Sequence, residues 1–376
     1  MGEGDIPLYP LLAQNLWPEI LRRPEYKSCR SKVVTEELFG ELKCLKTTAG
    51  WTLARAINTG VCHPRSQCGI HAGDSESYST FERVFDPVIR LWHQYDPKTQ
   101  LHFTDRDARK LAGLAIVDGD GCVESTRIRC ARNLEGFGLA PCLDKKDRLA
   151  IESLMCQALG SLTGDLAGQY YSAEHLTQKE AKELVGAGFA FRSIVGEDVD
   201  QFQAASGYHR VFPYGRGVYL NEARSFFVWL LEGDHIRVGS MQKGAEILAV
   251  FERLMRGLDA IEAALKSLNH GRGFQHSATL GYITCCPSNL GTGLRASVHA
   301  RLPHVRQRGD FEELMSAQKA ASEGRVWGTH GDRGDRGREQ QMQTGLQRSA
   351  TCATHGGGRE PFAPAGKGEQ RRGKVR

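Results

Sequence analysis

A hairpin-like segment followed directly by a long amphipathic helix is the feature that most constrains the fold. Residues 224–242, RSFFVWLLEGDHIRVGSMQ, contain two apolar strand-like runs joined by a tight turn at Glu232 to Asp234, with Gly233 in the turn. The next stretch, Ala245 to Leu268, repeats apolar residues at helical spacing. The pattern predicts an antiparallel strand pair covered by a helix.

Further strands and helices follow the same mixed order. CVESTRIRCARN (residues 122–133) alternates like a strand, and residues 144–162 form an amphipathic pattern with Leu149, Ile151, Leu154, Leu159 and Leu162 on or near one face. Residues 280–287 and 294–303 are again strand-like. Because no steady alternation of strand and helix appears, we expect an α+β fold with an antiparallel sheet flanked by helices.

The first third of the chain is mainly helical in pattern. TEELFGELKCL places Leu38, Leu42 and Leu45 at near-helical spacing, and Thr35 is positioned to cap the start. The stretch from residue 78 to residue 95 has another apolar stripe, which we expect to end or kink near Pro87. These patterns predict a small all-α N-terminal domain.

Changes in pattern divide the chain into five parts. They are an N-terminal extension (1–25), the helical domain (26–105), a polar linker (106–121), a larger domain (122–324) and a basic tail (325–376). The tail is rich in Gly, Arg and Gln, so we expect it to be disordered. We interpret it as solvated rather than as a nucleic-acid ligand.

The eleven cysteines contain no C-x-x-C pair, which argues against a zinc framework or a redox motif. The N-terminus has no basic region followed by an apolar core, and the apolar runs are far too short to cross a bilayer. We therefore expect reduced thiols in a cytoplasmic protein that has no membrane partner.

Arginines recur on the predicted strands: Arg127 and Arg129, then Arg237, then Arg295. Residues two apart on a strand share a face, so Arg127 and Arg129 point the same way. Adjacent guanidinium groups repel unless a polyanion lies between them, and a nucleotide triphosphate is such a polyanion. A solvated sheet face with paired carboxylates fits these residues equally well. The chain has neither G-x-x-x-x-G-K-[ST] nor G-x-G-x-x-G, so any nucleotide would have to be held by arginines.

The segment CCPSNLGTGLRASVH, residues 285–299, concentrates reactive side chains. Cys286 is followed by Pro287 and Ser288, and a hydroxyl or turn amides can stabilise a thiolate. A cysteine in a strand is also an ordinary small buried hydrophobic residue. Both interpretations remain open from these residues alone.

Several segments match the sequence motifs of one family in their order and spacing. They are STRIRCARNLEGF, FPYGRGVY, FFVWLLEGDHIRVGSMQKG and GYITCCPSNLGTGLRASVH, with the shorter GDLAGQYY and FDPVI. From about Tyr26 to Pro303 the chain resembles the phosphagen kinases, the ATP:guanidino phosphotransferases that include creatine and arginine kinases. The resemblance implies a helical N-terminal domain for the guanidino substrate and a larger ATP-binding domain. It also implies reversible transfer of the γ-phosphoryl of MgATP for energy buffering, by a monomer or homodimer.

The resemblance also implies roles for individual residues. Arg127, Arg129, Arg237 and Arg295 would bind the ATP phosphates, and His299 would lie beside the adenine. Cys286 would be the reactive thiolate next to the guanidinium, with Ser288 tuning its pKa, and Trp229 matches an essential tryptophan. Ser288 and Trp229 would both belong to the guanidino-substrate site. Mg²⁺ would be bound through ATP, with no protein ligand. Alignment of the partners and neutralisation of phosphate oxygens are what phosphoryl transfer mainly requires of a protein.

The loop before residue 78 is where the family reads the size of its acceptor. The short form GVCHPRSQCGIHAGD is typical of arginine kinases, whereas CPSNLGTGLRA is closer to creatine kinases. By resemblance, backbone N–H groups of Ser66, Gln67, Cys68, Gly69 and Ile70 would approach the carboxylate of the acceptor. His71 stands where arginine kinases usually have tyrosine. These observations leave arginine and creatine open, with arginine slightly favoured.

Three substitutions depart from the family at functional positions, and one of them is Gly188 in AGFAF, where the family has a histidine. The family's NEEDH is LEGDH here, so Gly233 replaces the glutamate that orients the guanidinium and only Glu232 remains as a candidate base. Loss of such a carboxylate typically costs about 10²–10⁴-fold in rate. Trp327 replaces a nucleotide-contacting arginine. We therefore expect impaired transfer, and an inactive member that binds nucleotide or a partner is the alternative.

The chain also departs from the family after Gly331. One codon spelling of Gly-Asp-Arg-Gly-Asp-Arg, shifted by one nucleotide, encodes Glu-Thr-Glu-Glu-Thr-Glu, which resembles the family's acidic loop. We hypothesise a frameshift near this position, in the gene or in its reading. Sequencing the transcript should reveal an alternative frame encoding a strand and a helix, and the absence of such a frame would refute the hypothesis.

Overall fold

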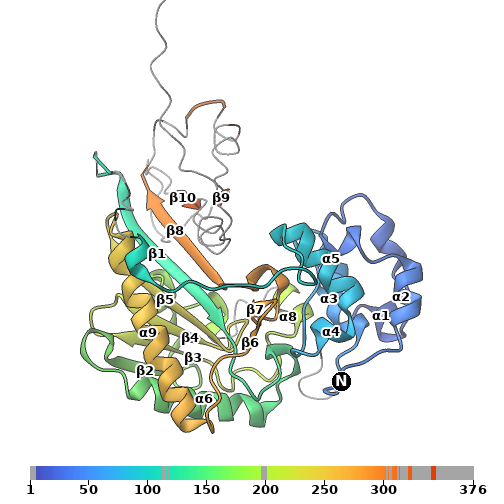
Figure 1. The fold of residues 1–376 in the computed structure, drawn as a ribbon, viewed down its shortest axis with the longest axis horizontal. Coiled ribbons are helices and arrows are strands. Elements are labelled where there is room, and N and C mark those ends of the chain that lie inside the picture. Colours follow the sequence, from blue (N-terminus) through green and yellow to red (C-terminus); the bar gives the residue numbers. More distant parts are fainter. Residues whose placement is uncertain are drawn as a thin grey trace, which may run out of the picture.

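The computed structural model describes residues 6–111, 113, 116, 118–119, 121–195, 201–301, 304, 307–310, 313, 321–323 and 340–343. This part of the chain forms a helical lobe and a larger lobe built on a sheet (Figure 1). The predictions for Trp327 and for the tail after residue 324 lie outside the described residues, apart from 340–343.

The helical lobe confirms the α-helical prediction for the first third. Its α-helices are α1 (Pro10–Ala13), α2 (Glu36–Leu42), α3 (Leu53–Cys62), α4 (Ser77–Thr80) and α5 (Glu82–His93). The Thr35 side chain accepts a hydrogen bond from the backbone N–H of Leu38, as its capping position predicts. The helix does not end near Pro87, so that part of the prediction was wrong. Helix α5 continues through Pro87, and the break falls instead at Phe81 (φ −113°, ψ 35°).

The core of the helical lobe includes residues on both sides of the domain predicted over 26–105. Leu12 and Leu21, from the segment before residue 26, are buried in the same cluster as Trp51. Cys285 and Leu290, from the far end of the chain, are buried there too. The cysteine segment is therefore packed against the helical lobe.

The larger lobe is a sheet flanked by helices, which confirms the α+β prediction. The described strands form a sheet of eight in the order β2-β3-β4-β5-β1-β8-β10-β9, and each of their pairings is antiparallel. The strands are β1 (Val123–Arg132), β2 (Gly168–Ser172), β3 (Gly217–Asn221), β4 (Phe226–Leu230), β5 (Ile236–Lys243), β8 (Leu294–Ala300), β9 (Ala321–Glu323) and β10 (Gln340–Gln343). A separate pair consists of β6 (His276–Ser277) and β7 (Gly281–Tyr282). The strand predicted over 280–287 is thus much shorter than expected.

Alternation along the strands separates the two faces of the sheet. Ile128, Cys130 and Val238 lie in the apolar cluster that includes residues of α6 (Lys145–Gly160) and α9 (Ile247–Leu268). Figure 1 shows α9 lying across this face. Leu149 of α6 is 38% exposed, so it does not join the buried stripe predicted for that helix. Helices α6 and α9 therefore cover the apolar face of the sheet, and the opposite face carries different side chains.

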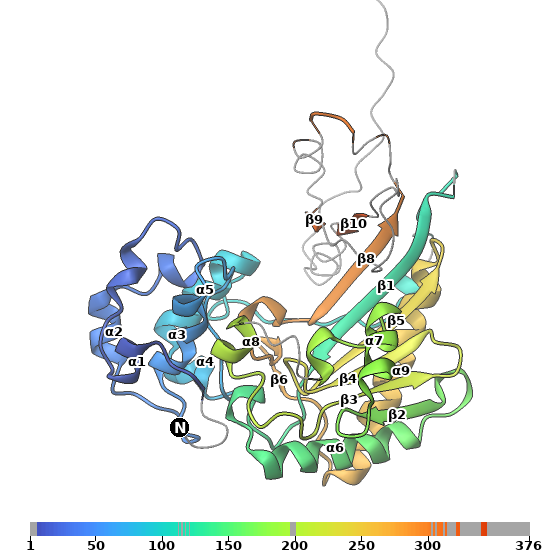
Figure 2. The same ribbon diagram turned by 180° about the vertical axis from the view of Figure 1, so that it is seen from behind.

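The opposite face is only partly covered. Phe227 and Trp229 pack there with Phe189, Phe191 and residues of α7 (Gln178–Gly186). Figure 2 shows α7 on this side of the sheet, whereas α8 (Gln201–Ser206) lies toward the helical lobe. These aromatic side chains and α7 cover β2, β3 and β4. The same face of β5, β1 and β8 carries the arginines described below. None of the described helices is long and apolar enough to cross a membrane.

The connection between β4 and β5 is a hydrogen-bonded network around His235. Leu231 adopts the left-handed conformation (φ 53°) and donates its N–H to the His235 carbonyl at 2.9 Å. The His235 ring accepts from the Leu134 N–H at Nδ1 (2.9 Å), so its Nε2–H donates to the Gly138 carbonyl (2.7 Å). Burial, with Arg148 nearby, lowers the pKa of His235 to about 3.

This neutral, buried histidine predicts acid sensitivity. Between about pH 6.5 and about pH 3, His235 is protonated in the unfolded chain and stays neutral in the folded chain. The free energy of unfolding should therefore fall as the pH falls, with this residue contributing about 1.4 kcal/mol per pH unit. Urea unfolding across this range should show a shallower slope in His235→Gln, whereas His270→Gln, at an exposed position, should keep the original slope. Equal slopes in both variants would contradict the prediction.

Candidate active site

The register of the central strands brings the predicted arginines together. Arg129 on β1 lies opposite Arg295 on β8, and Ala131 on β1 lies opposite Arg237 on β5. Arg127 shares the face of Arg129 because it is two residues away. The arginines from these three strands thus form one cluster, which we call the arginine row, on the face away from α9.

Aromatic rings line the base of the arginine row. The guanidinium carbon of Arg127 lies 5.0 Å from the centre of the Phe227 ring and 5.3 Å from that of Trp229. That of Arg129 lies 5.7 Å from the centre of the Trp229 ring. The Trp229 Nε1–H donates to the Phe189 carbonyl at 2.6 Å, which fixes the ring. The contacts of Trp229 are therefore with the predicted phosphate-binding arginines, although its predicted role was in binding the guanidino substrate.

The arginine row carries concentrated positive charge. Burial, together with Arg127, Arg237 and Arg295, lowers the pKa of Arg129 well below its usual value. At one end, Glu232 Oε2 lies 3.2 Å from a guanidinium nitrogen of Arg237. Although burial opposes it, Glu232 and Asp234 raise the pKa of Arg237. Arg127 is only 8% exposed, so the row does not resemble the solvated sheet face considered above, and it favours a polyanion.

His299 lies at the other end of the row. It faces Ser125 across β1 and β8, and the Ser125 hydroxyl lies 3.1 Å from His299 Nδ1. Burial, then Arg127, lowers the pKa of His299, which keeps the imidazole neutral at physiological pH. A neutral ring beside the cationic row suits contact with an aromatic base.

The two adjacent cysteines have opposite chemistry. Cys285 is completely buried, and burial, with Asp234 nearby, raises the pKa of its thiol well above the usual value. Cys286 is half-buried at the start of the short helix η7 (Pro287–Asn289), and its Sγ lies 3.1 Å from the Ser288 hydroxyl. A hydrogen bond from Cys68, then His71 and Ser288, lowers the pKa of Cys286 well below its usual value, although burial opposes this. The structure thus supports the thiolate interpretation for Cys286 and the hydrophobic one for Cys285.

The loop predicted to bind the acceptor lies directly against Cys286. Cys68 is buried and contacts the Cys286 sulfur, and the Gly69 N–H is already occupied by the Ser66 hydroxyl at 3.1 Å. Gln67 is exposed, whereas Ile70 is fully buried in the helical core. The loop packs on α3 through glycine, because a Cβ at Gly60 would collide with the Gly69 carbonyl. Of the predicted acceptor residues, only Cys68 and Ser288 make described contacts with the thiolate.

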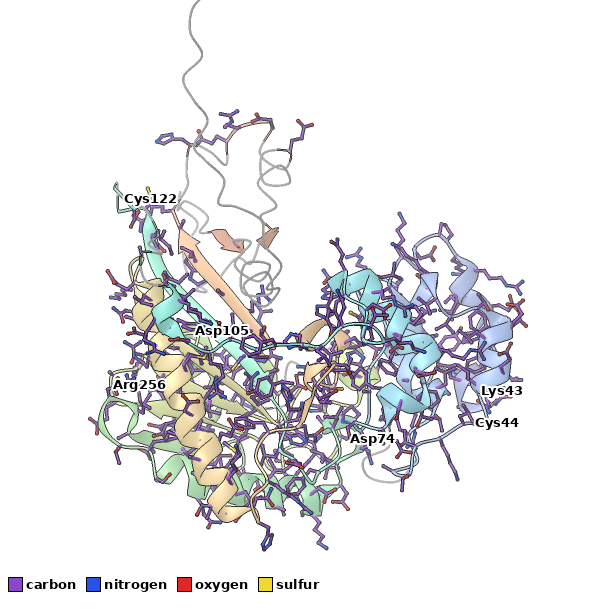
Figure 3. All side chains as sticks on the ribbon, in the orientation of Figure 1. Lys43, Cys44, Asp74, Asp105, Cys122 and Arg256 are labelled. Atoms are coloured by element: carbon purple, nitrogen blue, oxygen red, sulfur yellow. The ribbon has the colours of Figure 1, made fainter. Side chains whose placement is uncertain are left out.

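Asp234 and Asn133 hold the cysteine segment and were not predicted. Asp234 Oδ1 accepts from the Cys285 N–H at 2.8 Å and from the Asn133 side chain at 2.9 Å. The Ala72 N–H donates to the Cys285 carbonyl at 2.8 Å from the helical lobe. In Figure 3, Asp74, two residues further on, lies where the two lobes meet. The signal for Asp234 was its place in LEGDH, but a sequence does not show which backbone groups a buried aspartate satisfies.

Profiles of one family match both lobes. The profile of the ATP:guanido phosphotransferase N-terminal domain matches residues 24–90, and that of the C-terminal catalytic domain matches residues 150–336. Strand β1, with Arg127 and Arg129, lies between the two matched ranges.

Curated relatives extend this match over most of the chain. The arginine kinase of Stichopus japonicus is 40% identical over 299 residues, which are 80% of this chain and 79% of that protein. The B-type creatine kinase of Gallus gallus is 41% identical over 298 residues, 78% of this chain and 76% of that protein. The arginine kinase of Anthopleura japonica is 39% identical over 301 residues, 80% of this chain. The chain spans only 40% of the length of that last protein.

Solved structures agree with this assignment. A lombricine kinase superposes with a TM-score of 0.76 at 32% identity, covering 88% of each chain. The duplicated taurocyamine kinase from Schistosoma mansoni, with bound transition-state-analogue components, gives 0.76 at 30% identity, covering 91% of this chain and 46% of that one. With both lobes matched and relatives of about 40% identity along most of its length, the chain belongs to the ATP:guanido phosphotransferases, the phosphagen kinase family.

Proposed function

We propose that this chain transfers the γ-phosphoryl of MgATP reversibly to a guanidino acceptor, as an energy-buffering enzyme of the cytoplasm. The observation that carries the proposal is the arginine row in the same structure as a low-pKa cysteine. The first provides positive charge for a polyphosphate, and the second provides negative charge for a guanidinium.

The arginine row fits a nucleotide triphosphate. Arg127, Arg129, Arg237 and Arg295 project from neighbouring strands and can neutralise several phosphate oxygens at once. His299, neutral at the far end, is placed for the base. Magnesium would enter bound to the phosphates and neutralise charge that develops during transfer. A rigid sheet holds these donors before the nucleotide arrives, which is the arrangement that phosphoryl transfer requires.

The acceptor would bind beside Cys286. A guanidino nitrogen attacks the γ-phosphorus, the bond to the oxygen that bridges the β- and γ-phosphorus atoms breaks, and ADP leaves with that electron pair. The attacking nitrogen loses one proton, for which Glu232 is the candidate acceptor. Glu232 is positioned by Arg237, whose guanidinium nitrogen lies 3.2 Å from Glu232 Oε2. The thiolate holds the guanidinium by charge and takes no part in the bonds that change.

Arginine is the acceptor we propose, with creatine as the runner-up. The short loop around residues 66–70 supports arginine, and two of the relatives above are arginine kinases. Support for creatine comes from the wording of the cysteine segment and from the creatine kinase relative. The proposed active form is a monomer or homodimer.

Gly233 supports a second candidate, a member that binds nucleotide without transferring phosphate. The neighbouring Glu232 already pairs with Arg237, so the position that could orient the acceptor has no side chain. Impaired transfer by the chain as it stands is therefore part of the proposal.

Phosphoryl transfer by the purified chain tests these candidates. MgATP would be supplied with arginine, creatine, taurocyamine or glycocyamine, and nucleotide binding would be measured by calorimetry. Transfer to one acceptor, lost in Cys286→Ala, would support the enzyme and name its substrate. Nucleotide binding without transfer to any of them would favour the inactive member, and the absence of both would overturn the proposal.

Removing one arginine should weaken nucleotide binding. Arg129→Ala deletes a charge-assisted contact worth about 1.5–3 kcal/mol, so the Kd for MgATP should rise about 10- to 100-fold. Arg301→Ala is the matched control, because Arg301 is exposed and pairs with Glu124 beyond the end of β8. Equal affinities of both variants would contradict the assignment of the row to phosphate.

Restoring the carboxylate at position 233 should raise the rate of transfer. Gly233→Glu places a base beside the site, and a gain in kcat on the order of 10²-fold or more is expected. Its Cβ would approach Tyr208 Cε2 to 3.3 Å, so that ring must give slightly. Gly233→Ala introduces the same Cβ without the carboxylate and should not gain activity. Equal rates in the two variants would show that the missing glutamate does not limit the enzyme.

A further inference from the structure

His71 is held rigidly next to the cysteine segment. Its backbone N–H donates to the Ala56 carbonyl at 2.9 Å, and its carbonyl accepts from Trp51 Nε1 at 3.3 Å. The following residue, Ala72, exchanges two contacts with Cys285: its N–H donates to the Cys285 carbonyl, and its carbonyl accepts from Cys285 Sγ at 3.1 Å. This pairing brings position 71 alongside position 286.

The imidazole ring is enclosed and has one polar neighbour of note. It meets Phe202 and Tyr208 edge-on, with ring centres 5.6 Å and 5.4 Å away. The side chain is 1% exposed, and neither ring nitrogen has an oxygen or nitrogen partner among the described residues. The ring instead lowers the pKa of the Cys286 thiol, because it stabilises a negative charge on that sulfur.

A half-buried thiolate needs compensation, since burial alone raises the pKa of a thiol. Cys68 donates its S–H to Cys286, and Ser288 lies at 3.1 Å, but both are neutral. Of these three groups, His71 is the one that can carry a full positive charge. His93 also interacts with Cys286, but burial lowers the pKa of His93. The other titratable groups that act on or feel the charge of Cys286 are Cys29, Tyr78, His93, Tyr208 and Cys285.

We propose that His71 is a positioning residue that keeps Cys286 as a thiolate by forming the cationic half of an ion pair with it. The thiolate is thereby ready before any guanidino acceptor arrives. The proposal deepens the function proposed above, because that thiolate is the group that would hold the acceptor.

Alkylation of Cys286 tests the proposal without nucleotide or acceptor, so its outcome is independent of whether the chain transfers phosphate. Iodoacetamide modification would be followed peptide by peptide from about pH 5 to about pH 9, a range that brackets an ordinary thiol pKa. In the unaltered chain the rate should change little with pH. In His71→Phe it should titrate with a higher midpoint and be at least about 10-fold slower near pH 6, as expected once the pKa of the thiol lies about one unit or more above that pH. His71→Gln, which keeps a donor but no charge, should lie between the two.

His63→Phe is the matched control. His63 also meets the Phe202 ring edge-on, with ring centres 5.8 Å apart, and it is not among the groups that lower the pKa of Cys286. It should keep the original pH profile. A folded His71→Phe chain with an unchanged profile would overturn the proposal. If that variant does not fold, the ionisation of Cys286 can be measured in the unaltered chain instead. The measurement follows thiolate absorbance near 240 nm as the pH changes, with the signal of Cys286→Ser subtracted. Ionisation of Cys286 at the usual thiol pKa would then refute the proposal.

Discussion

The two-residue period of strand β1 is the constraint on which the larger lobe depends. Ile128 and Cys130 point to α6 and α9, so Arg127 and Arg129 must point the other way. Apolar burial on one face therefore forces guanidinium groups together on the other, despite their repulsion. The hydrophobic core, which is the larger energy, holds the arginine row in place. A polyanion that binds in the arginine row would relieve the repulsion between its guanidinium groups, which is present in the folded chain before anything binds.

The negative side of the site depends on a different device, the joining of two lobes. Asp234 of the sheet lobe and Ala72 of the helical lobe both bond to the backbone of Cys285. Cys286 then emerges at the junction with donors from both directions, Cys68 and His71 on one side and Ser288 on the other. Neither lobe alone supplies this environment. Opposite charges are thus built by separate means, one by strand register and one by an interface between lobes.

Sequence reasoning was strongest where a short period decides the outcome. The shared face of Arg127 and Arg129, the cap at Thr35 and the antiparallel class all follow from spacing, and the structure agrees. Spacing does not give the register between strands, so the pairing of Arg129 with Arg295 came only from the structure. It also could not separate Cys285 from Cys286, because burial and charge from distant residues decide their protonation. Pro87 did not end the helix as one form of the prediction had it, because the buried residues around it hold α5 together despite one missing N–H donor.

The contact between Gly60 and Gly69 extends control of the acceptor loop to a residue outside it. The two backbones touch so closely that any side chain at position 60 would have to displace the loop. Gly60 lies within α3, fully buried and facing away from solvent. The shape of the loop therefore depends partly on α3, because position 60 has no Cβ atom. Among related chains, a change of preferred substrate can arise from a helix position that no substrate ever reaches.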